Sequence, residues 1–427
     1  MTPAARIQAA IELLDLALAG ERPADRLAAD YFRQRRYAGS GDRAAILALL
    51  YGALRRMARL RWRCGEAASA RALMLGYLRD VEGRTPEQLA ALFDGGRFAP
   101  APLDAGEQEL LAALAEPPSP EPDWVAGNYP AWLDAALAES LGDAKLAEMQ
   151  ALNEQAPLDL RVNTLKADRE TVRRALADEG IEALPGRFSP LCLRLPGRQS
   201  LQRHRLFRDG LIEVQDEGSQ LIALLTGVAP GETMVDHCAG AGGKTLALAA
   251  MMANGGRLIA CDAAAYRLGR LTPRLRRAGI GIVEVMATDD PALAEGMADR
   301  VLVDAPCSGT GAWRRSPEAR WRLTGAELSA LEETQAAILA RAARLVRPGG
   351  RLVYATCSLL RGENEAQVAR FLAGHGDFAV LPIAEAWAES IGGTAPAPGD
   401  SLHLSPLRTA TDGFFVAVLQ RRRGGPT

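Results

Sequence analysis

A short apolar stretch that runs into a glycine-rich loop constrains this chain more than any other feature. Residues 234–245 read Met-Val-Asp-His-Cys-Ala-Gly-Ala-Gly-Gly-Lys-Thr. The residues that follow, 246–253, are all leucine, alanine or methionine. These three residue types favour helices, so the pattern predicts a strand, a tight glycine turn and a helix. Such a turn lets the backbone approach a ligand at the N-terminus of the helix.

Two phosphate-binding templates do not fit this loop. A Walker A loop needs a glycine five residues before Gly243, where Cys238 stands. A dinucleotide fingerprint that starts at Gly240 needs a glycine at Thr245. A nucleoside cofactor without a phosphate chain, such as S-adenosylmethionine, fits better, with Asp236 as a polar contact. The alternative is a purely structural turn between a strand and a helix.

Size and composition bound the remaining choices. The chain has 427 residues, enough for two or three domains, and its 48% hydrophobic and 24% charged residues are typical of a soluble protein. It lacks an apolar run of the roughly 20 residues that span a bilayer and the apolar core of a signal peptide, so we expect a cytoplasmic protein. The six cysteines form no Cys-x-x-Cys pair and histidines number four, which argues against a disulfide framework or a metal site. Because the net charge is only −2, a nucleic acid would have to be held by local basic patches.

We expect three domains. Residues 1–125 form a helical domain that ends in a Pro-rich linker, residues 126–205 a small α+β subdomain, and residues 206–427 a doubly wound α/β domain. In the first domain, apolar spacing predicts a third helix over residues 42–61, with a basic cluster over residues 55–63. This cluster is either a solvated helix end or an RNA contact.

In the last domain, strands and helices alternate. The predicted strands are Thr233–Asp236, Arg257–Cys261, Ile282–Met286, Arg300–Val303, Arg351–Ala355 and Phe414–Leu419. The predicted helices are Lys244–Ala253, Ala264–Ala278 with a kink at Pro273, Gly325–Leu345 and Glu363–Ala373. Little room for a crossover helix precedes the last strand, so we expect it to be antiparallel, as in methyltransferase-type sheets.

Polar residues follow four more of these strands, at the sheet edge where open α/β sheets bind ligands. Asp262 is placed to accept both ribose hydroxyls of an adenosine, or else to cap a helix. Asp289 and Asp290 either contact the adenine amino group or cap a turn. Two further strand ends carry Asp304-Ala-Pro-Cys307-Ser-Gly-Thr-Gly and Thr356-Cys357-Ser358.

Two cysteines at neighbouring strand ends point to covalent catalysis, although cysteine is also among the most often buried residues. Carbon 5 of a pyrimidine is a weak nucleophile. A thiolate that adds at C6 turns the ring into an enamine, whose C5 can attack a methyl sulfonium. An acid near N3, such as Asp304, would stabilise the charge that develops there.

Several stretches resemble the RsmB/Sun (Nop-type) family of RNA cytosine-5 methyltransferases. They are Leu160-Arg-Val-Asn-Thr, Val214-Gln-Asp-Glu-Gly-Ser-Gln, the glycine loop, Asp304-Ala-Pro-Cys-Ser-Gly-Thr-Gly-Ala-Trp-Arg-Arg, Tyr354-Ala-Thr-Cys-Ser and Thr411-Asp-Gly-Phe-Phe-Val. Pro-Cys-Ser-Gly together with Thr-Cys-Ser is highly specific. The resemblance implies a Rossmann-like, S-adenosylmethionine-dependent methyltransferase domain, preceded by an α+β RNA-recognition subdomain and an all-helical NusB-like N-terminal domain.

The resemblance also implies roles for single residues. It makes Cys357 the nucleophile and lets Cys307 assist product release, whereas DNA cytosine methyltransferases use the Pro-Cys position as nucleophile and chemistry alone would favour Cys307. Asp304 is the third expected catalytic residue. The expected cofactor contacts are Cys238, Ala239, Gly240, Ala241, Gly242, Gly243, Lys244, Asp262, Asp289 and Asp304. Family members commonly have Ala and Pro in place of Gly240 and Ala241, so we expect a more flexible loop here.

RNA is the expected partner, ribosomal RNA of the 16S type ahead of transfer RNA. The predicted RNA contacts are Arg161, Asn163, Arg314, Arg315 and Arg320, the last three beside tryptophans that suit an extruded base. We expect a monomer without a metal or a membrane partner. Two other functions stay open: a non-catalytic RNA-binding factor on the same fold, and a DNA cytosine methyltransferase.

Overall fold

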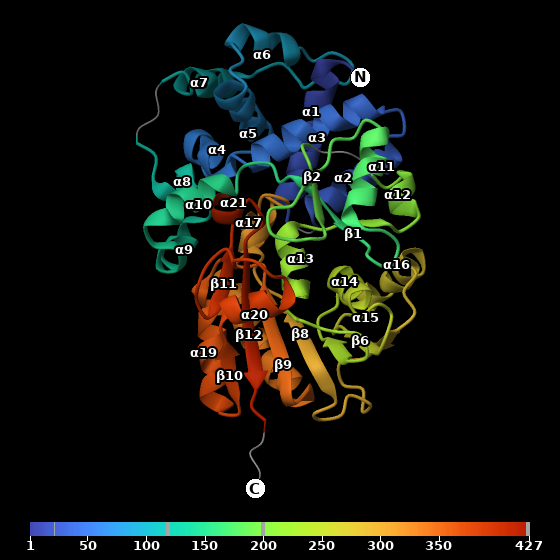
Figure 1. The fold of residues 1–427 in the computed structure, drawn as a ribbon. Helices are drawn as coiled ribbons and strands as arrows, with labels where there is room; N and C mark the ends of the chain where they lie inside the picture. Colours follow the sequence, from blue (N-terminus) through green and yellow to red (C-terminus); the bar gives the residue numbers. More distant parts are fainter. Residues whose placement is uncertain (21, 117–119, 198–200, 424–427) are drawn as a thin grey trace. The chain divides into compact units, whose positions relative to one another are not determined.

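Residues 312–324 pack with the first 155 residues of the chain, although the two segments are far apart in sequence. The computed structural model describes residues 1–20, 22–116, 120–197 and 201–423 (Figure 1). One unit, here the helical unit, joins Met1–Gln155 to Ala312–Thr324. The other, the sheet unit, joins Ala156–Gly311 to the chain from Gly325 onward. The predicted boundaries at 125 and 205 remain a prediction, and part of the predicted linker, residues 117–119, lies outside the described residues.

The helical unit consists of helices and turns. Its α-helices are α1 (Pro3–Leu18), α2 (Ala24–Gln34), α3 (Ser40–Leu54), α4 (Met57–Cys64), α5 (Ala70–Gly76), α6 (Pro86–Leu92), α7 (Ala105–Ala113), α8 (Asp123–Ala126), α9 (Asp134–Leu141), α10 (Lys145–Ala151) and α17 (Ala319–Arg322). Local sequence explains where several begin: Thr2 caps α1, and α6 and α7 start with capping boxes at Thr85 and Asp104.

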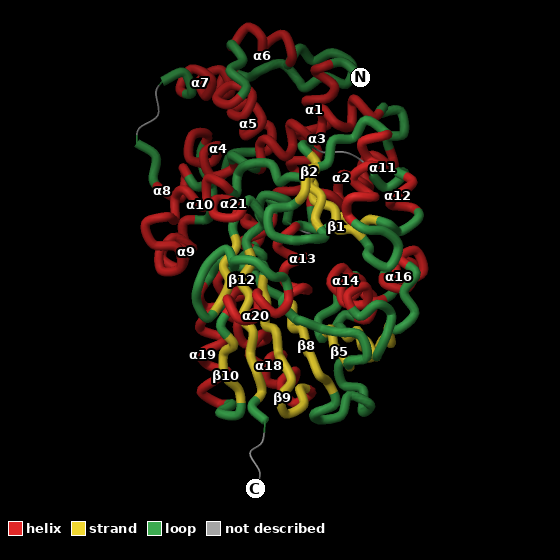
Figure 2. Tube along the Cα trace, viewed as in Figure 1, coloured by secondary structure: helices red, strands yellow, loops and turns green. Residues whose placement is uncertain are grey.

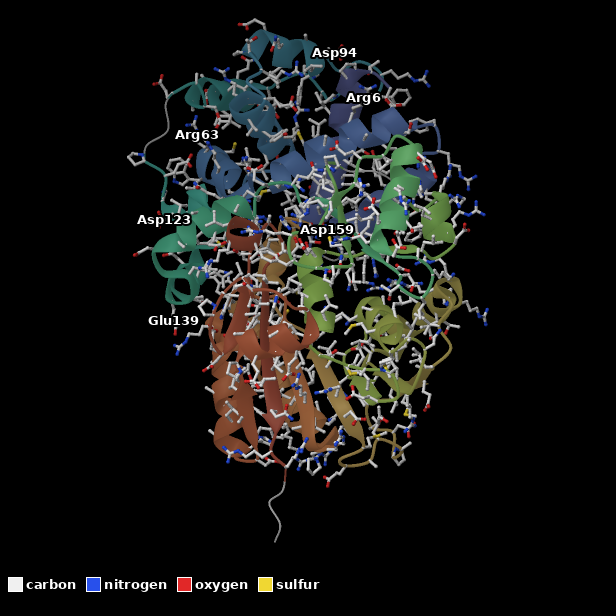
Figure 3. All side chains as sticks on the ribbon, in the orientation of Figure 1. Arg6, Arg63, Asp94, Asp123, Glu139 and Asp159 are labelled. Atoms are coloured by element: carbon white, nitrogen blue, oxygen red, sulfur yellow. The ribbon has the colours of Figure 1, made fainter. Side chains whose placement is uncertain are left out.

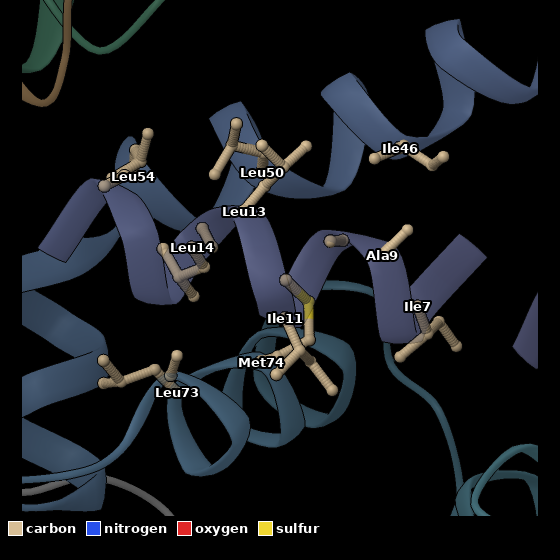
Figure 4. Packing of buried hydrophobic residues seen from close by; sticks show 14 of the residues in the cluster. Ile7, Ala9, Ile11, Leu13, Leu14, Ile46, Leu50, Leu54, Leu73 and Met74 are labelled. Atoms are coloured by element: carbon tan, nitrogen blue, oxygen red, sulfur yellow. The ribbon is translucent and has the colours of Figure 1, made fainter. Parts of the chain in front are cut away.

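The core of the helical unit forms where α1 packs against α3 and α5 (Figure 4). Ile7, Ile11 and Leu14 recur at helical spacing on α1 and are buried with Leu50 of α3 and Leu73 of α5. The apolar periodicity near the N-terminus thus produces the helical fold that the sequence predicts.

The predicted third helix is in fact two helices, α3 and α4. The chain leaves helical geometry at Arg56, whose φ and ψ are −130° and 15°. The basic cluster that follows is used inside the unit: Arg59 pairs with Glu121 at 3.1 Å, and Arg63, labelled in Figure 3, pairs with Asp80 at 3.4 Å. The basic cluster thus contributes to packing within the helical unit, and nothing in these contacts requires RNA.

A small antiparallel sheet opens the sheet unit. Its strands are β1 (Leu158–Val162), β2 (Leu184–Pro185), β3 (Cys192–Leu195) and β4 (Ile212–Val214), in the order β2-β3-β1-β4, with helices α11 (Arg169–Asp178) and α12 (Arg205–Arg208). Leu160 and Val162 of β1 pack in its core with Val172 and Leu176 of α11. The predicted α+β subdomain is therefore present.

The large sheet has the order β10-β12-β9-β8-β5-β6-β7, and β11 pairs with β12. Figure 2 shows β10, β12, β9, β8 and β5 among its yellow strands. Its strands are β5 (Thr233–Asp236), β6 (Arg257–Cys261), β7 (Val283–Met286), β8 (Ala298–Asp304), β9 (Val346–Thr356), β10 (Phe378–Leu381), β11 (Ser401–Leu404) and β12 (Phe414–Arg421). Strands β5 to β9 run parallel, and β12 is antiparallel to β9, which confirms the predicted antiparallel last strand.

Helices cover both faces of this sheet. They are α13 (Glu217–Leu224), α14 (Gly243–Met251), α15 (Ala265–Leu268), α16 (Leu271–Ala278), α18 (Gly325–Leu345), α19 (Glu365–Gly374), α20 (Ile383–Ser390) and α21 (Pro406–Thr409). Along β8, Val301 and Val303 pack on the side of α18 and α19, and Leu302 on the side of α13 and α14, as the period of two in a strand requires. None of the described helices is both long and apolar enough to cross a membrane.

Candidate active site

The glycine loop joins β5 to α14 in a conformation that needs glycine. Gly240 and Gly242 have φ values of 56° and 84°, in the left-handed region that other residues rarely adopt. A Cβ atom on Gly242 would lie 2.1 Å from Leu271 Cδ1, whereas the space beside Gly240 is open. The loop therefore packs on one side against α16 and presents free backbone on the other.

That free side lines a cavity of about 850 Å³ at the carboxyl ends of the parallel strands. Of the residues predicted to hold the cofactor, the lining includes Cys238, Ala239, Gly240, Ala241, Gly243, Lys244, Asp262 and Asp304. Asp289 follows β7, is exposed and is not among the lining residues in the described part of the chain. Its contact with the cofactor remains a prediction.

Three carboxylates lie around this cavity. Asp262 accepts hydrogen bonds from the backbone N–H of Gly240 at 2.9 Å and of Ala264 at 2.8 Å, so it both fixes the loop and caps the next turn. Asp304 forms an ion pair with Lys244 at 2.7 Å. Asp236 is buried, and burial raises the pKa of its carboxyl to about 7. One of its oxygens accepts from Thr245 Oγ1 at 2.7 Å, and the other has no partner among the described residues.

The donor set fits S-adenosylmethionine. Exposed backbone at Gly240 allows close approach, Asp262 offers acceptors for ribose hydroxyls, and Asp236 lines the same cavity. The carboxylates also suit a ligand that carries a positive sulfonium.

Cys307 and Cys357 line the same cavity, and their sulfur atoms are 3.3 Å apart. They meet because β8 and β9 are neighbouring parallel strands with Asp304 opposite Ala355, and each cysteine follows one of them. The hydrogen bond to Cys357 and burial raise the pKa of the Cys307 thiol well above its ordinary value. A third cysteine in the cavity, Cys238, is held as a thiol because burial raises its pKa strongly.

Glycine also controls the turn after Cys307. A Cβ atom on Gly311 would lie 2.2 Å from the carbonyl oxygen of Gly413, and the N–H of Gly311 donates to the carbonyl of Cys357 at 2.9 Å. Gly311 is therefore in direct backbone contact with Gly413 of the Thr-Asp-Gly stretch and with Cys357 of the Thr-Cys-Ser stretch.

Glu363 is the residue of this site that the sequence did not reveal. It is 0% exposed, and its carboxylate accepts hydrogen bonds from Ser308 and Ser358, the residues directly after the two cysteines. No recognisable motif marks a single glutamate after a turn. The nearest sequence signal is its place a few residues beyond Cys357 at the predicted start of a helix.

The residues predicted to contact RNA lie elsewhere. Arg161 is 3% exposed and donates to Gln215 and, at 2.6 Å, to the carbonyl of Gly243 in the glycine loop. Asn163 is 5% exposed and donates to the carbonyls of Gly210 and Ala278, each at 2.9 Å. Both therefore tie the small sheet to the rest of the sheet unit, and neither presents a surface to RNA.

The other three belong to the helical unit. Arg320 is fully buried and donates to the carbonyl of Asn128 and, at 2.8 Å, to Asn153 Oδ1. Arg314 is buried as well, and Arg315 is partly exposed. Arg314 and Arg320 are buried and do not offer donors at the surface. Of these three arginines, Arg315 alone is exposed enough to contact RNA.

Family models, relatives and a solved structure all match this chain over long stretches. A family model described as 16S rRNA methyltransferase RsmB/F matches residues 223–420, and a ferredoxin-like domain model of the RsmF/B-like methyltransferases matches residues 129–202. A probable ribosomal RNA small subunit methyltransferase B from Synechocystis is 35% identical over 69% of this chain and 67% of its own length. The ribosomal RNA small subunit methyltransferase B of Sodalis glossinidius is 31% identical over 88% of this chain and 89% of its own. The crystal structure of PH0851 superimposes with a TM-score of 0.81 at 27% identity, over 99% of both chains.

Proposed function

Because this chain belongs to the RsmB/F family of 16S rRNA methyltransferases, which use S-adenosylmethionine, we propose that it methylates C5 of cytosine in ribosomal RNA through a covalent bond between Cys357 and C6. The observation that carries this proposal is the pair of thiols 3.3 Å apart in the cavity of the glycine loop. The names of the relatives suggest small-subunit rRNA as the substrate.

Seven residues of the cavity have a defined task in this reaction: Gly240, Asp262, Asp236, Cys357, Asp304, Lys244 and Cys307. Gly240, Asp262 and Asp236 hold the cofactor, which supplies an electrophilic methyl group when bound. The Cys357 thiolate adds at C6, forming an S–C6 bond and moving the C5=C6 π electrons to C5, which becomes nucleophilic. N3 takes a proton from solvent as the thiolate adds, and Asp304, held by its ion pair with Lys244, accepts a hydrogen bond from this N3–H and so stabilises the protonated ring.

Release reverses the addition. After methylation, a base removes the C5 proton, the C–H electrons re-form the C5=C6 bond, and the S–C6 bond breaks so that Cys357 leaves as a thiolate. Cys307, whose sulfur lies 3.3 Å from that of Cys357, is the group placed to assist this step.

Two cysteine variants test the proposal together with its assignment of roles. With unmodified small-subunit rRNA and labelled S-adenosylmethionine, the wild-type protein should place label in C5 of cytosine. Cys307→Ala should accumulate a covalent protein–RNA adduct that survives denaturing electrophoresis, and Cys357→Ala should form none. Turnover should fall at least about 10³-fold in both variants, as for other nucleophilic catalysts that lose one group of a unit. Cys64→Ala, which removes a thiol of the helical unit that does not line this cavity, is the control for adduct formation.

The outcomes separate the competing functions. The opposite adduct pattern would exchange the roles of the two cysteines. Cofactor binding without transfer to ribosomal or transfer RNA would favour a non-catalytic RNA-binding factor, and transfer to DNA in preference to RNA would favour a DNA methyltransferase.

A further inference from the structure

Glu363 is a buried carboxylate that the reaction described above does not use. It ends a short 3₁₀ turn, Arg361–Glu363, which precedes α19, and it is 0% exposed. Its Oε1 accepts from the backbone N–H of Ser308 at 2.8 Å and from Gln335 Nε2 at 2.9 Å. Its Oε2 accepts from the hydroxyls of Ser308 and Ser358. Each oxygen thus has two donors, the acceptor-only pattern of an ionised carboxylate whose lone pairs are all used.

These contacts bracket both cysteines. Gln335, besides donating to Glu363, donates to the carbonyl of Pro306 at 2.9 Å, so Cys307 is held by the residue before it and the residue after it. Asn364, next to Glu363, does the same for Cys357. It accepts from Thr356 Oγ1 at 2.6 Å and donates to the carbonyl of Ser358 at 3.0 Å.

Glu363 reaches both turns through one side chain. Ser308 lies on the turn after β8 and Ser358 on the turn after β9, and the two share the same carboxylate oxygen. Their own hydroxyls are 3.3 Å apart, the same separation as the two sulfur atoms. The carboxylate therefore clamps the two turns one residue beyond the reacting thiols.

We propose that Glu363 is a positioning residue for the methyl-transfer reaction, which holds the serines after Cys307 and Cys357 and thereby fixes the spacing of the two thiols. This inference rests on the proposed function, in which both thiols act on one base. A shift of about 1 Å in the placement of a reacting group costs on the order of 10²-fold in rate, so a clamp on both turns matters for catalysis.

The negative charge of Glu363 also affects the pKa of the Cys307 thiol. Besides the hydrogen bond to Cys357 and burial, the negative charge of Glu363 contributes to the raised pKa of Cys307. Tyr354 is a further titratable group near this thiol; its hydroxyl donates to the backbone carbonyl of Glu363, and burial raises its own pKa. Asp304, Lys244 and Cys238 line the same cavity as Cys307. Removing the charge of Glu363 should therefore make the Cys307 thiolate easier to form.

Glu363→Gln tests the charge, because an amide can point its oxygen at the two N–H donors and its NH₂ group at the rotatable hydroxyls. The double variant Ser308→Ala/Ser358→Ala tests the clamp without altering the charge. Glu332→Gln is the matched control: this glutamate lies beside Gly362, and no hydrogen bond joins it to either turn in the described structure.

With saturating RNA, we expect Glu363→Gln and the double serine variant each to lower kcat about 10- to 100-fold, with KM for RNA and cofactor affinity within about twofold of wild type. Glu332→Gln should stay within about twofold in kcat. In the Cys307→Ala background, Glu363→Gln should also slow adduct formation by a similar factor.

A second readout needs no RNA. In a Cys357→Ala background, iodoacetamide alkylation of Cys307 is followed against pH by mass spectrometry. Glu363→Gln should move the midpoint of this profile to lower pH by about 0.5–1 unit, and Glu332→Gln should leave it in place. If the wild-type protein fails to methylate cytosine while Glu363→Gln still shifts the profile, the proposed function is wrong and the effect of the Glu363 charge on Cys307 stands. Unchanged kcat and an unchanged profile in Glu363→Gln would overturn the inference.

Discussion

Asp236 is a single buried side chain whose charge state affects the stability of the protein. Burial raises the pKa of its carboxyl to about 7, and one oxygen has no hydrogen-bond partner among the described residues. The folded-state pKa therefore lies above that of the unfolded chain. Such a group contributes stability that is fully present below the unfolded pKa, near pH 4, and is lost as pH rises to 7.

We therefore predict that Asp236→Asn stabilises the cofactor-free protein at pH 8. The amide stays neutral and can still accept from Thr245, so it avoids burying a charge. The gain in unfolding free energy over wild type should grow by about 2–4 kcal/mol between pH 4 and pH 7 and then level off. Urea unfolding at a series of pH values measures it. A gain that is independent of pH would show that Asp236 is not the titrating group.

At the scale of elements, the glycine loop is braced from outside the strand and helix that it joins. Arg274 of α16 donates to the carbonyl of Ala241 at 2.6 Å and to Glu213 of β4 at 3.1 Å. Arg161 of β1 donates to the carbonyl of Gly243 on the other side of the loop. Two strands of the small sheet, β1 and β4, therefore help to hold the loop that lines the cofactor cavity.

Arg274→Met should weaken cofactor binding without unfolding the protein. The methionine keeps most of the aliphatic packing and loses both hydrogen bonds, so the loop at Ala241 gains freedom that binding must remove. We expect the Kd for S-adenosylmethionine, from isothermal titration calorimetry, to rise about 5- to 20-fold, the equivalent of 1–2 kcal/mol. Arg276→Met, an exposed arginine on the same helix, is the control and should bind like wild type. Equal affinity of the two variants would refute the bracing role.

Elements were predictable wherever apolar runs end in glycine or an acid. β5 and β6 were predicted with their observed bounds, and so was α18, because local periodicity decides them. The predicted helix over residues 264–278 is instead two helices, α15 and α16, separated at Gly269 and Arg270, and Pro273 falls in the first turn of α16, where proline is tolerated. β10, α20 and β11 were missed because these short elements owe their stability to the edge of the sheet.

In the candidate site, too, some residues were predictable from local sequence and others were not. The cofactor loop and both cysteines follow from sequence, because short motifs place them at strand ends. The prediction of an RNA contact for Arg320 rests on its place beside tryptophans after the Pro-Cys turn, and Arg161 and Asn163 lie in the Leu160-Arg-Val-Asn-Thr stretch that resembles the family. Their partners are carbonyls supplied by segments distant in sequence, such as Asn128 for Arg320, and no local pattern announces such a partner.

On the scale of the whole molecule, the helical unit is completed by a segment from the middle of the chain. Arg320 occupies its interior over the ring of Trp313 at 5.0 Å, and burial lowers the pKa of its guanidinium to about 9. The carbonyl of Asn128 and the side chain of Asn153 take its hydrogen bonds. The segment 312–324 is therefore a structural part of the helical unit.

Arg320→Ala should consequently destabilise the protein by about 2–4 kcal/mol, since it removes buried hydrogen bonds and leaves a cavity. Arg322→Ala, a partly exposed arginine of the same segment, should cost less than about 1 kcal/mol. Urea unfolding of the full-length variants measures both. If Arg320 contacted RNA instead, its variant would lose RNA affinity at unchanged unfolding free energy.

Because residues 312–324 belong to the helical unit, this unit is completed late in synthesis. The ribosome synthesises Gln155 long before it reaches Thr324, and at about 5–20 residues per second the interval is roughly 10–30 s. Throughout that time the nascent helical unit lacks the residues that fill its interior around Asn128 and Asn153. This amino-terminal part therefore cannot finish folding as it emerges, and its last step waits for the chain that carries Cys307 to be translated.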